Sequence, residues 1–178
     1  MRRIIKVNYF NRPHIENGAI EKISKVLKSH GIKNPLICSD PGLSSIGMTE
    51  KIRSLISDDL SPSFYEETPA NPTEKAVSEA LEIYKSNNCD GVIGFGGGSS
   101  MDLGKAVALM ANHDGNLIDY SVVQGGYKRI TETVPMIAIP TTSGTGSEVS
   151  DGALIIMNDG RKLILASPHL RPNAAICD

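Results

Sequence analysis

Short apolar runs alternate along the chain with longer segments in which apolar residues recur at helical spacing. A short apolar run is typical of a strand buried on both faces, and helical spacing is typical of a helix with one buried side. The runs predict strands at 4–9, 35–38, 63–65, 92–95, 135–139 and 174–177. The spacing predicts helices that begin at 17 or 18, at 43 or 44, at 73 and at 99 or 100, and a short helical turn at 116–120.

Turn signals set the expected limits of several elements. Residues 10–13 are expected to leave the first strand, and Gly31 to end the first helix. The second helix is expected to run to position 57, broken by Gly47 near its start. The polar segment 121–134 is predicted to be a loop. Asn158-Asp159-Gly160 is a strong hairpin signal between apolar runs at 153–157 and 162–166.

Strands that alternate with helices predict parallel βαβ units. The expected fold is therefore a single α/β domain of 178 residues: a Rossmann-like parallel sheet with helices on both faces, plus a β-hairpin near the C-terminus. Ligands of such folds bind beyond the carboxyl ends of the strands. Four polar loops fall there in this chain, at Asp40, 66–71, 96–99 and 141–145, and they are expected to converge on one edge.

The segment 90–105 couples a buried strand to three consecutive glycines and the start of a helix. Glycines let a ligand approach the backbone, and a helix N-terminus offers free N–H groups to a phosphate. Ser99 and Ser100 are the expected N-cap residues. The alternative is a tight strand-to-helix connection with no ligand. The generic dinucleotide and P-loop patterns both require a glycine where Ser99 stands, so they do not identify the nucleotide.

A second strand, at 135–139, runs into the hydroxyl- and glycine-rich segment 140–149. Gly96-Gly97-Gly98-Ser99-Ser100-Met101-Asp102 followed by Ile139-Pro140-Thr141-Thr142-Ser143-Gly144-Thr145-Gly146-Ser147-Glu148 closely resembles the iron-containing (group III) alcohol dehydrogenases. The order and spacing of the two blocks are similar to those of that family. The resemblance covers essentially the whole chain, but only the N-terminal, cofactor-binding domain of the family protein.

The resemblance implies an NAD site. Gly97, Gly98 and Ser99 resemble the family's pyrophosphate cradle, and Asn71 falls near the nicotinamide end. Asp40 resembles the acid that accepts from the adenosine ribose, and it would repel the 2′-phosphate of NADP. Each has a plainer alternative: Asp40 in an Asp-Pro-Gly turn, Asn71 as a cap or turn residue.

The remaining cofactor-binding candidates come from the same resemblance. The loop that carries Thr141, Thr142, Thr145 and Ser147 is expected to wrap the adenosine and pyrophosphate side of the cofactor, or alternatively to be only a hydroxyl-rich helix entry. A carboxylate repels a phosphate directly, so the plain role of Asp102 is to support the helix start through capping and the helix dipole. The family motif includes it, which implies binding through water or orientation of the glycine loop. Asp151 and Lys162 fall where the family has a polar cofactor contact and a lysine, and the alternative for Lys162 is a solvated charge.

Composition narrows the classes of partner. A net charge of −2 and an aromatic content of 4%, without Trp, provide neither a basic surface nor a stacking platform for nucleic acid. No long apolar run follows Met1, so we expect no signal peptide and no membrane span. Cys38, Cys89 and Cys177 lack CxxC spacing, which favours reduced thiols in a cytoplasmic protein.

The resemblance also implies a divalent metal, iron or zinc, that one aspartate and three histidines of a following helical domain would hold. His14, His30, His113 and His169 show no i,i+3 or i,i+4 pairing, so no helical metal face is expected here. The expected function is the cofactor-binding half of an NAD-dependent, metal-dependent dehydrogenase of small alcohols or aldehydes, inactive alone. Pairing of its first strand with that of a second copy would make it a homodimer. The alternatives are a non-catalytic nucleotide-binding fragment and an enzyme of the glycerol dehydrogenase or dehydroquinate synthase type.

Overall fold

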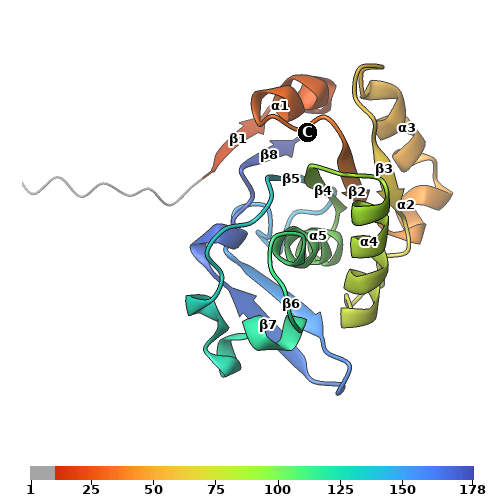
Figure 1. Ribbon diagram of the computed structural model, residues 1–178. Coiled ribbons are helices and arrows are strands. Elements are labelled where there is room, and N and C mark those ends of the chain that lie inside the picture. Colours follow the sequence, from red (N-terminus) through yellow and green to blue (C-terminus); the bar gives the residue numbers. More distant parts are fainter. Residues whose placement is uncertain (1–10) are drawn as a thin grey trace, which may run out of the picture.

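The computed structural model describes residues 11–178, so the strand predicted at 4–9 lies outside the described residues. Six parallel strands form one sheet in the order β1 (Arg12–Ile15), β8 (Ala174–Cys177), β5 (Met136–Pro140), β4 (Gly91–Gly96), β2 (Pro35–Cys38) and β3 (Ser63–Tyr65) (Figure 1). Positions 12 and 13, expected to leave the first strand, instead belong to β1. The predicted Rossmann-like parallel sheet is confirmed.

Alternate residues of each central strand supply the two cores, as the pleat of a strand requires. On one face, Ile37, Ile93 and Ile137 pack against α1 (Ile23–Ser29) and α3 (Met48–Leu55). On the other face, Leu36 and Val92 pack with α4 (Glu74–Ser86) and α5 (Gly98–Met110). The sheet is therefore covered by helices on both faces, as predicted.

The predicted hairpin is present as β6 (Gly152–Ile156) and β7 (Lys162–Ala166), which pair antiparallel as a separate two-stranded sheet. It lies on the α5 side of the main sheet, where Ile155 and Leu165 are buried in the same core as α5 (Figure 1). The Ile156 N–H donates to the Pro72 carbonyl at 2.9 Å, which joins β6 to the loop before α4.

The second predicted helix, with its break at Gly47, is present as two helices, α2 (Pro41–Ser45) and α3; it begins at 41 rather than 43 or 44 and ends at 55 rather than 57. Gly47 separates them at φ 77°, in the left-handed region that continues no helix. The first predicted helix likewise begins as the 3₁₀ turn η1 (Ala19–Lys22) and continues as α1.

Short 3₁₀ turns complete the chain. The turn predicted at 116–120 is η2 (Leu117–Tyr120). The segment predicted as a loop contains η3 (Val122–Gln124) and η4 (Gly126–Lys128), and η5 (Pro168–Leu170) precedes β8. Among the described residues, none of the helices has the length and apolar character needed to cross a membrane. The three cysteines are all free.

Two glycines let α5 lie very close to the central strand β4. A Cβ placed on Gly94 would come within 2.8 Å of the Met101 Cα, and one on Gly104 would come within 3.4 Å of the Gly94 Cα. The absence of both side chains therefore brings helix backbone against strand backbone. This contact fixes where the N-terminus of α5 meets the carboxyl edge of the sheet.

Replacing Gly94 by alanine should reduce the free energy of unfolding by about 1–3 kcal/mol, because the new methyl group must push α5 away from β4. Urea unfolding of the two proteins measures the difference. The control is Gly144→Ala, since a Cβ at Gly144 meets no atom within 4 Å and its φ is not positive. Equal stability of Gly94→Ala and Gly144→Ala would contradict the close approach.

Candidate functional site

The four polar loops predicted to converge do lie together at the carboxyl edge of the sheet. They follow β2, β3, β4 and β5, which are neighbours in the sheet. The chain leaves β2 toward β3 on one side and then returns to form β4 on the other side of β2. This reversal between β2 and β4 is a topological switch point, where ligands of parallel α/β sheets bind.

The N-terminus of α5 opens onto this switch point. Its N-cap is Gly97, not Ser99 or Ser100 as predicted, and no side chain caps it. Both serines instead lie in the first turn, because the helix begins one residue after the strand exit. A Cβ on Gly97 would first meet Thr142 Oγ1 at 3.7 Å, an ordinary contact distance. Packing within the protein therefore does not require glycine at this position, whereas a ligand close to the backbone would.

A cavity of about 490 Å³, which we call the Asp40 cavity, lies on one side of this helix start. It is lined by residues of all four loops: 40–43, 68–70, 97–100, 141 and 142. Asp40 caps α2 by accepting a hydrogen bond at Oδ1 from the Leu43 N–H, at 3.0 Å. Asp40 can therefore cap the helix and also face the cavity, because the capping bond uses only one of its two carboxylate oxygens.

Two buried hydroxyl groups lie at the Asp40 cavity without a partner. Thr68 and Ser100 are each 1% exposed. Neither Thr68 Oγ1 nor Ser100 Oγ has a hydrogen-bond partner among residues 11–178. Buried polar atoms are normally paired, so an unpaired one calls for an explanation. Gly96, at φ 143°, lies beside them: a Cβ there would approach Ser100 Oγ to 2.6 Å and Asp40 Oδ2 to 3.1 Å.

A second cavity of about 480 Å³, the Asn71 cavity, lies on the other side of the same helix start. Gly98 and Ser99 line both cavities. The Lys162 ammonium donates to Asn71 Oδ1 at 2.8 Å, so the structure brings these two predicted residues together from β7 and the loop before α4. Leu154 and Ile164, paired across the hairpin and each 42% exposed, give this cavity an apolar wall.

The hydroxyl-rich loop is divided between the two cavities. Thr141 and Thr142 line the Asp40 cavity, whereas Thr145 and Ser147 line the Asn71 cavity. The Ser99 hydroxyl donates to the Ala70 carbonyl at 2.5 Å, which ties the helix start to the loop after β3. The loop therefore contributes to the walls of both cavities.

The two predicted aspartates at the Asn71 cavity are held by the protein itself. Asp102 accepts from the Ser147 hydroxyl at 2.7 Å and from the Leu154 N–H at 2.9 Å. Asp151 Oδ2 lies 3.4 Å from Arg171 Nη2. Asp102 therefore links α5 to the 147–154 segment through two hydrogen bonds.

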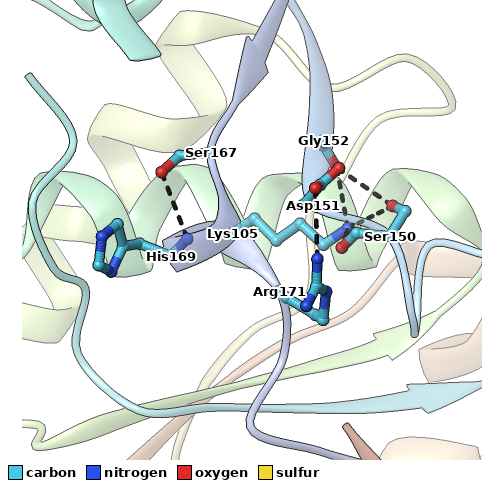
Figure 2. Close-up of polar contacts among 7 residues, drawn as sticks. All are labelled: Lys105, Ser150, Asp151, Gly152, Ser167, His169 and Arg171. Atoms are coloured by element: carbon cyan, nitrogen blue, oxygen red, sulfur yellow. Dashed lines mark hydrogen bonds and ion pairs between the residues drawn. The ribbon is translucent and has the colours of Figure 1, made fainter. Parts of the chain in front are cut away.

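Lys105 is a residue of the site region that the sequence analysis did not assign. Lys105 is fully buried, and its ammonium donates to Ser150 Oγ, the Ser150 carbonyl and the Gly152 carbonyl at 2.8–3.1 Å (Figure 2). It also donates to Ser147 Oγ at 2.9 Å. Burial lowers the pKa of the ammonium to about 8, against the opposing effect of the carboxylates of Asp102, Asp151 and Glu148. The available signal was a lysine between Gly104 and Ala106 within the apolar part of α5.

Comparison with known proteins identifies the family. Residues 11–178 match the sequence profile of the iron-containing alcohol dehydrogenases. The chain belongs to that family. Over 173 residues it is 42% identical to the 4-hydroxybutyrate dehydrogenase of Cupriavidus necator, an alignment that covers 97% of this chain and 45% of that protein.

Solved structures of this family have the same fold. The NADH-dependent butanol dehydrogenase A of Thermotoga maritima superposes with a TM-score of 0.88 at 28% identity, over 100% of this chain and 44% of that one. The sulfoacetaldehyde reductase of Bifidobacterium kashiwanohense, solved in complex with NAD⁺, superposes with a TM-score of 0.87 at 26% identity, over 99% of this chain and 46% of that one. The chain thus spans less than half the length of each of these relatives.

The family's name implies iron, but the described part of this chain does not assemble a metal site. Within residues 11–178, no three His, Cys, Asp or Glu side chains are grouped so that they could hold a metal ion. His113 is used structurally: its Nδ1 pairs with the Leu109 carbonyl at 3.0 Å, and its ring packs edge-on against Tyr120. The residues present therefore fit a nucleotide and do not fit a metal.

The lowered pKa of Lys105 predicts a pH-dependent contribution to stability. In the unfolded chain the Lys105 ammonium keeps its proton up to its ordinary pKa of 10.5, whereas in the folded protein it loses the proton near pH 8. Between these two pKa values the unfolded state binds the extra proton, so the free energy of unfolding rises with pH. This gain is lost again as the pH falls to about 8. Relative to Lys105→Met, the native protein should gain about 2–3 kcal/mol of unfolding free energy between about pH 8 and pH 10.

Urea unfolding of both proteins at several pH values gives this difference. Taking the difference matters because burial also raises the pKa of Tyr84, to about 12, which acts in the opposite direction in alkaline solution and cancels between the two proteins. A difference that stays flat across the window would show that Lys105 does not titrate as a buried ammonium.

Proposed function

We propose that this chain is the cofactor-binding part of an NAD-dependent alcohol dehydrogenase, and that its 178 residues form one dinucleotide-binding domain. The observation that carries the proposal is the pair of cavities that meet at Gly98 and Ser99, at the uncapped N-terminus of α5. A dinucleotide has two nucleoside halves joined by a pyrophosphate. The backbone N–H groups at the helix start suit the pyrophosphate, and each cavity suits one half.

The adenosine half belongs in the Asp40 cavity. Asp40 Oδ2 is available to accept from a ribose hydroxyl, because the hydrogen bond from Leu43 uses Oδ1. The unpaired hydroxyls of Thr68 and Ser100 offer further polar contacts at the same wall. A 2′-phosphate beside the Asp40 carboxylate would meet like-charge repulsion, so NAD is preferred over NADP.

The nicotinamide half belongs in the Asn71 cavity. The paired Asn71 and Lys162 side chains supply polar groups for its ribose, and Leu154 and Ile164 supply an apolar surface for the ring. Thr145 lies opposite, where a Cβ on Gly98 would come within 2.8 Å of its methyl group. Gly98 is thus required both by this neighbour and by the helix start that binds the phosphate.

The reaction proposed for the whole protein is hydride exchange between NAD(H) and a small alcohol or aldehyde. A divalent metal, iron or zinc, would polarise the substrate oxygen when bound. Residues 11–178 hold no group of metal ligands, so we propose that a segment outside them supplies the ligands of the metal and completes the substrate site. The protein would act in the cytoplasm, as a homodimer.

Binding of the two cofactors tests the cofactor site directly. Calorimetric titration at one ionic strength should show NAD binding with much weaker NADP binding. Asp40→Asn removes the charge but keeps an acceptor oxygen for the Leu43 N–H, so NADP affinity should rise about tenfold while NAD affinity falls modestly.

The matched control is Asp58→Asn, which removes the same charge from an exposed position before β3. It should leave both affinities unchanged. A folded chain that binds neither cofactor would refute the proposed site, and equal binding of both by the native chain would remove Asp40 as the selector.

An activity measurement tests the proposal that the metal ligands lie outside the described residues. The purified 178-residue chain, supplied with NAD, a small primary alcohol and Fe²⁺ or Zn²⁺, should show no NADH formation above background at 340 nm, because its described residues cannot hold the metal. Robust metal-dependent oxidation would contradict this. Absence of turnover together with NAD binding also fits a non-catalytic nucleotide-binding protein. Adding the metal-binding part of a relative as a separate chain distinguishes the two, since restored activity supports the dehydrogenase.

A further inference from the structure

We propose that Lys105 and Asp102 of α5 form an internal anchor that positions the 147–154 segment, and with it one wall of the Asn71 cavity, and that Lys105 does so without touching the cofactor. The inference rests on the proposed cofactor function for its consequence, but the anchor itself is a property of the fold. It gives Lys105 the role of a positioning residue.

The geometry separates Lys105 from any ligand. Its residue has no exposed surface and it does not line either cavity, although Asp102, three residues earlier on the helix, lines the Asn71 cavity. All four acceptors of its ammonium lie between 147 and 152. An ammonium has three protons, so the four short distances use its donors completely. No proton remains to bind a phosphate.

Ser147 connects the two charged residues of α5. Its hydroxyl oxygen accepts from Lys105 at 2.9 Å, and its proton is donated to Asp102 Oδ1 at 2.7 Å. The positive and negative groups are therefore linked through one hydroxyl. Asp102 Oδ2 then accepts from the Leu154 N–H. Charge-assisted hydrogen bonds of this kind are the stronger ones, particularly in a buried site.

The anchored segment carries the wall that the nicotinamide half would contact. It begins at Ser147, contributes positions 150–153 to the lining of the Asn71 cavity, and ends within β6 at Leu154, whose side chain forms part of the apolar surface. Gly152, an acceptor of Lys105, is also the first residue of β6. The anchor thus sets where the hairpin begins relative to the N-terminus of α5.

Other charged groups around Lys105 support this role. The carboxylates of Asp102, Asp151 and Glu148 all favour its charged form. Asp151 is itself held by Arg171, 3.4 Å away, next to the Lys105 contacts (Figure 2). The ammonium is therefore the centre of an alternating set of charges that joins α5, the 147–152 segment and the residue after η5.

The test compares NAD with ADP, which lacks the nicotinamide half. If the anchor positions only the nicotinamide-side wall, Lys105→Met should weaken NAD binding by about tenfold while ADP binding stays within about twofold. Lys105→Arg keeps the charge but not the geometry, and it should restore NAD affinity only in part. Lys25→Met, the same substitution at an exposed position of α1, should change neither affinity.

A second measurement is independent of any cofactor. Hydrogen exchange followed by NMR should show that Lys105→Met and Asp102→Asn speed exchange of the Leu154 amide, while amides of β4 keep their protection. This separates local release of the segment from global unfolding. If NAD fails to bind the native chain, the proposed function is wrong, but the amide result still decides whether the anchor exists.

Two results would overturn the inference. Equal losses of ADP and NAD affinity in a folded Lys105→Met protein would show that Lys105 acts on the pyrophosphate. An unchanged Leu154 amide in the same protein would show that the segment is held by other contacts. Selective loss of NAD binding together with faster Leu154 exchange is the result expected.

Discussion

The close approach of α5 to β4 is the constraint on which the rest of this structure depends. Gly94 and Gly104 bring helix and strand into backbone contact, and this contact determines where three other features lie. The N-terminus of α5 is placed at the switch point between β2 and β4. One flank of the helix faces the 147–154 segment. The hairpin then packs against α5 rather than joining the main sheet.

The helix has two kinds of polar function along its length. Its first turn is open, uncapped by any side chain, and bordered by a cavity on each side. One turn later, Asp102 and Lys105 point into the neighbouring segment, where their hydrogen bonds are made entirely within the protein. A free helix end suits a ligand that comes and goes, whereas satisfied buried charges suit a permanent contact.

The sequence predicted the architecture well because the responsible signals are local. Buried strands at 35–38 and 63–65, Thr73 as the cap of α4, and Asn158-Asp159-Gly160 between β6 and β7 each depend on neighbouring residues alone. The error at the start of α5 arose where one residue decides between two local structures. Gly97 is the N-cap of α5 in place of the serines that follow it, whereas Gly47 breaks the second helix as expected by taking a left-handed conformation.

The candidate site was predictable as a set of loops but not as a set of contacts. Parallel topology brings Asp40, the glycines and Thr141 to one edge whatever their side chains do. Which of two cavities receives Thr145, and whether Asp102 faces solvent or the Ser147 hydroxyl, depends on distances between segments more than forty positions apart. Lys105 was missed for the same reason, since its four acceptors lie in a segment that only the tertiary fold brings near.

The hairpin described above is engaged along both of its outer edges. The Ile156 N–H of β6 bonds to Pro72, and Leu165 of β7 forms an isolated bridge with Ser121. Each edge of this two-stranded ribbon thus makes a backbone contact with a neighbouring loop, which leaves less of it open as a template for another strand. The wall that the hairpin contributes to the Asn71 cavity is therefore tied to the protein at three places: α5, the loop before α4, and the turn at Ser121.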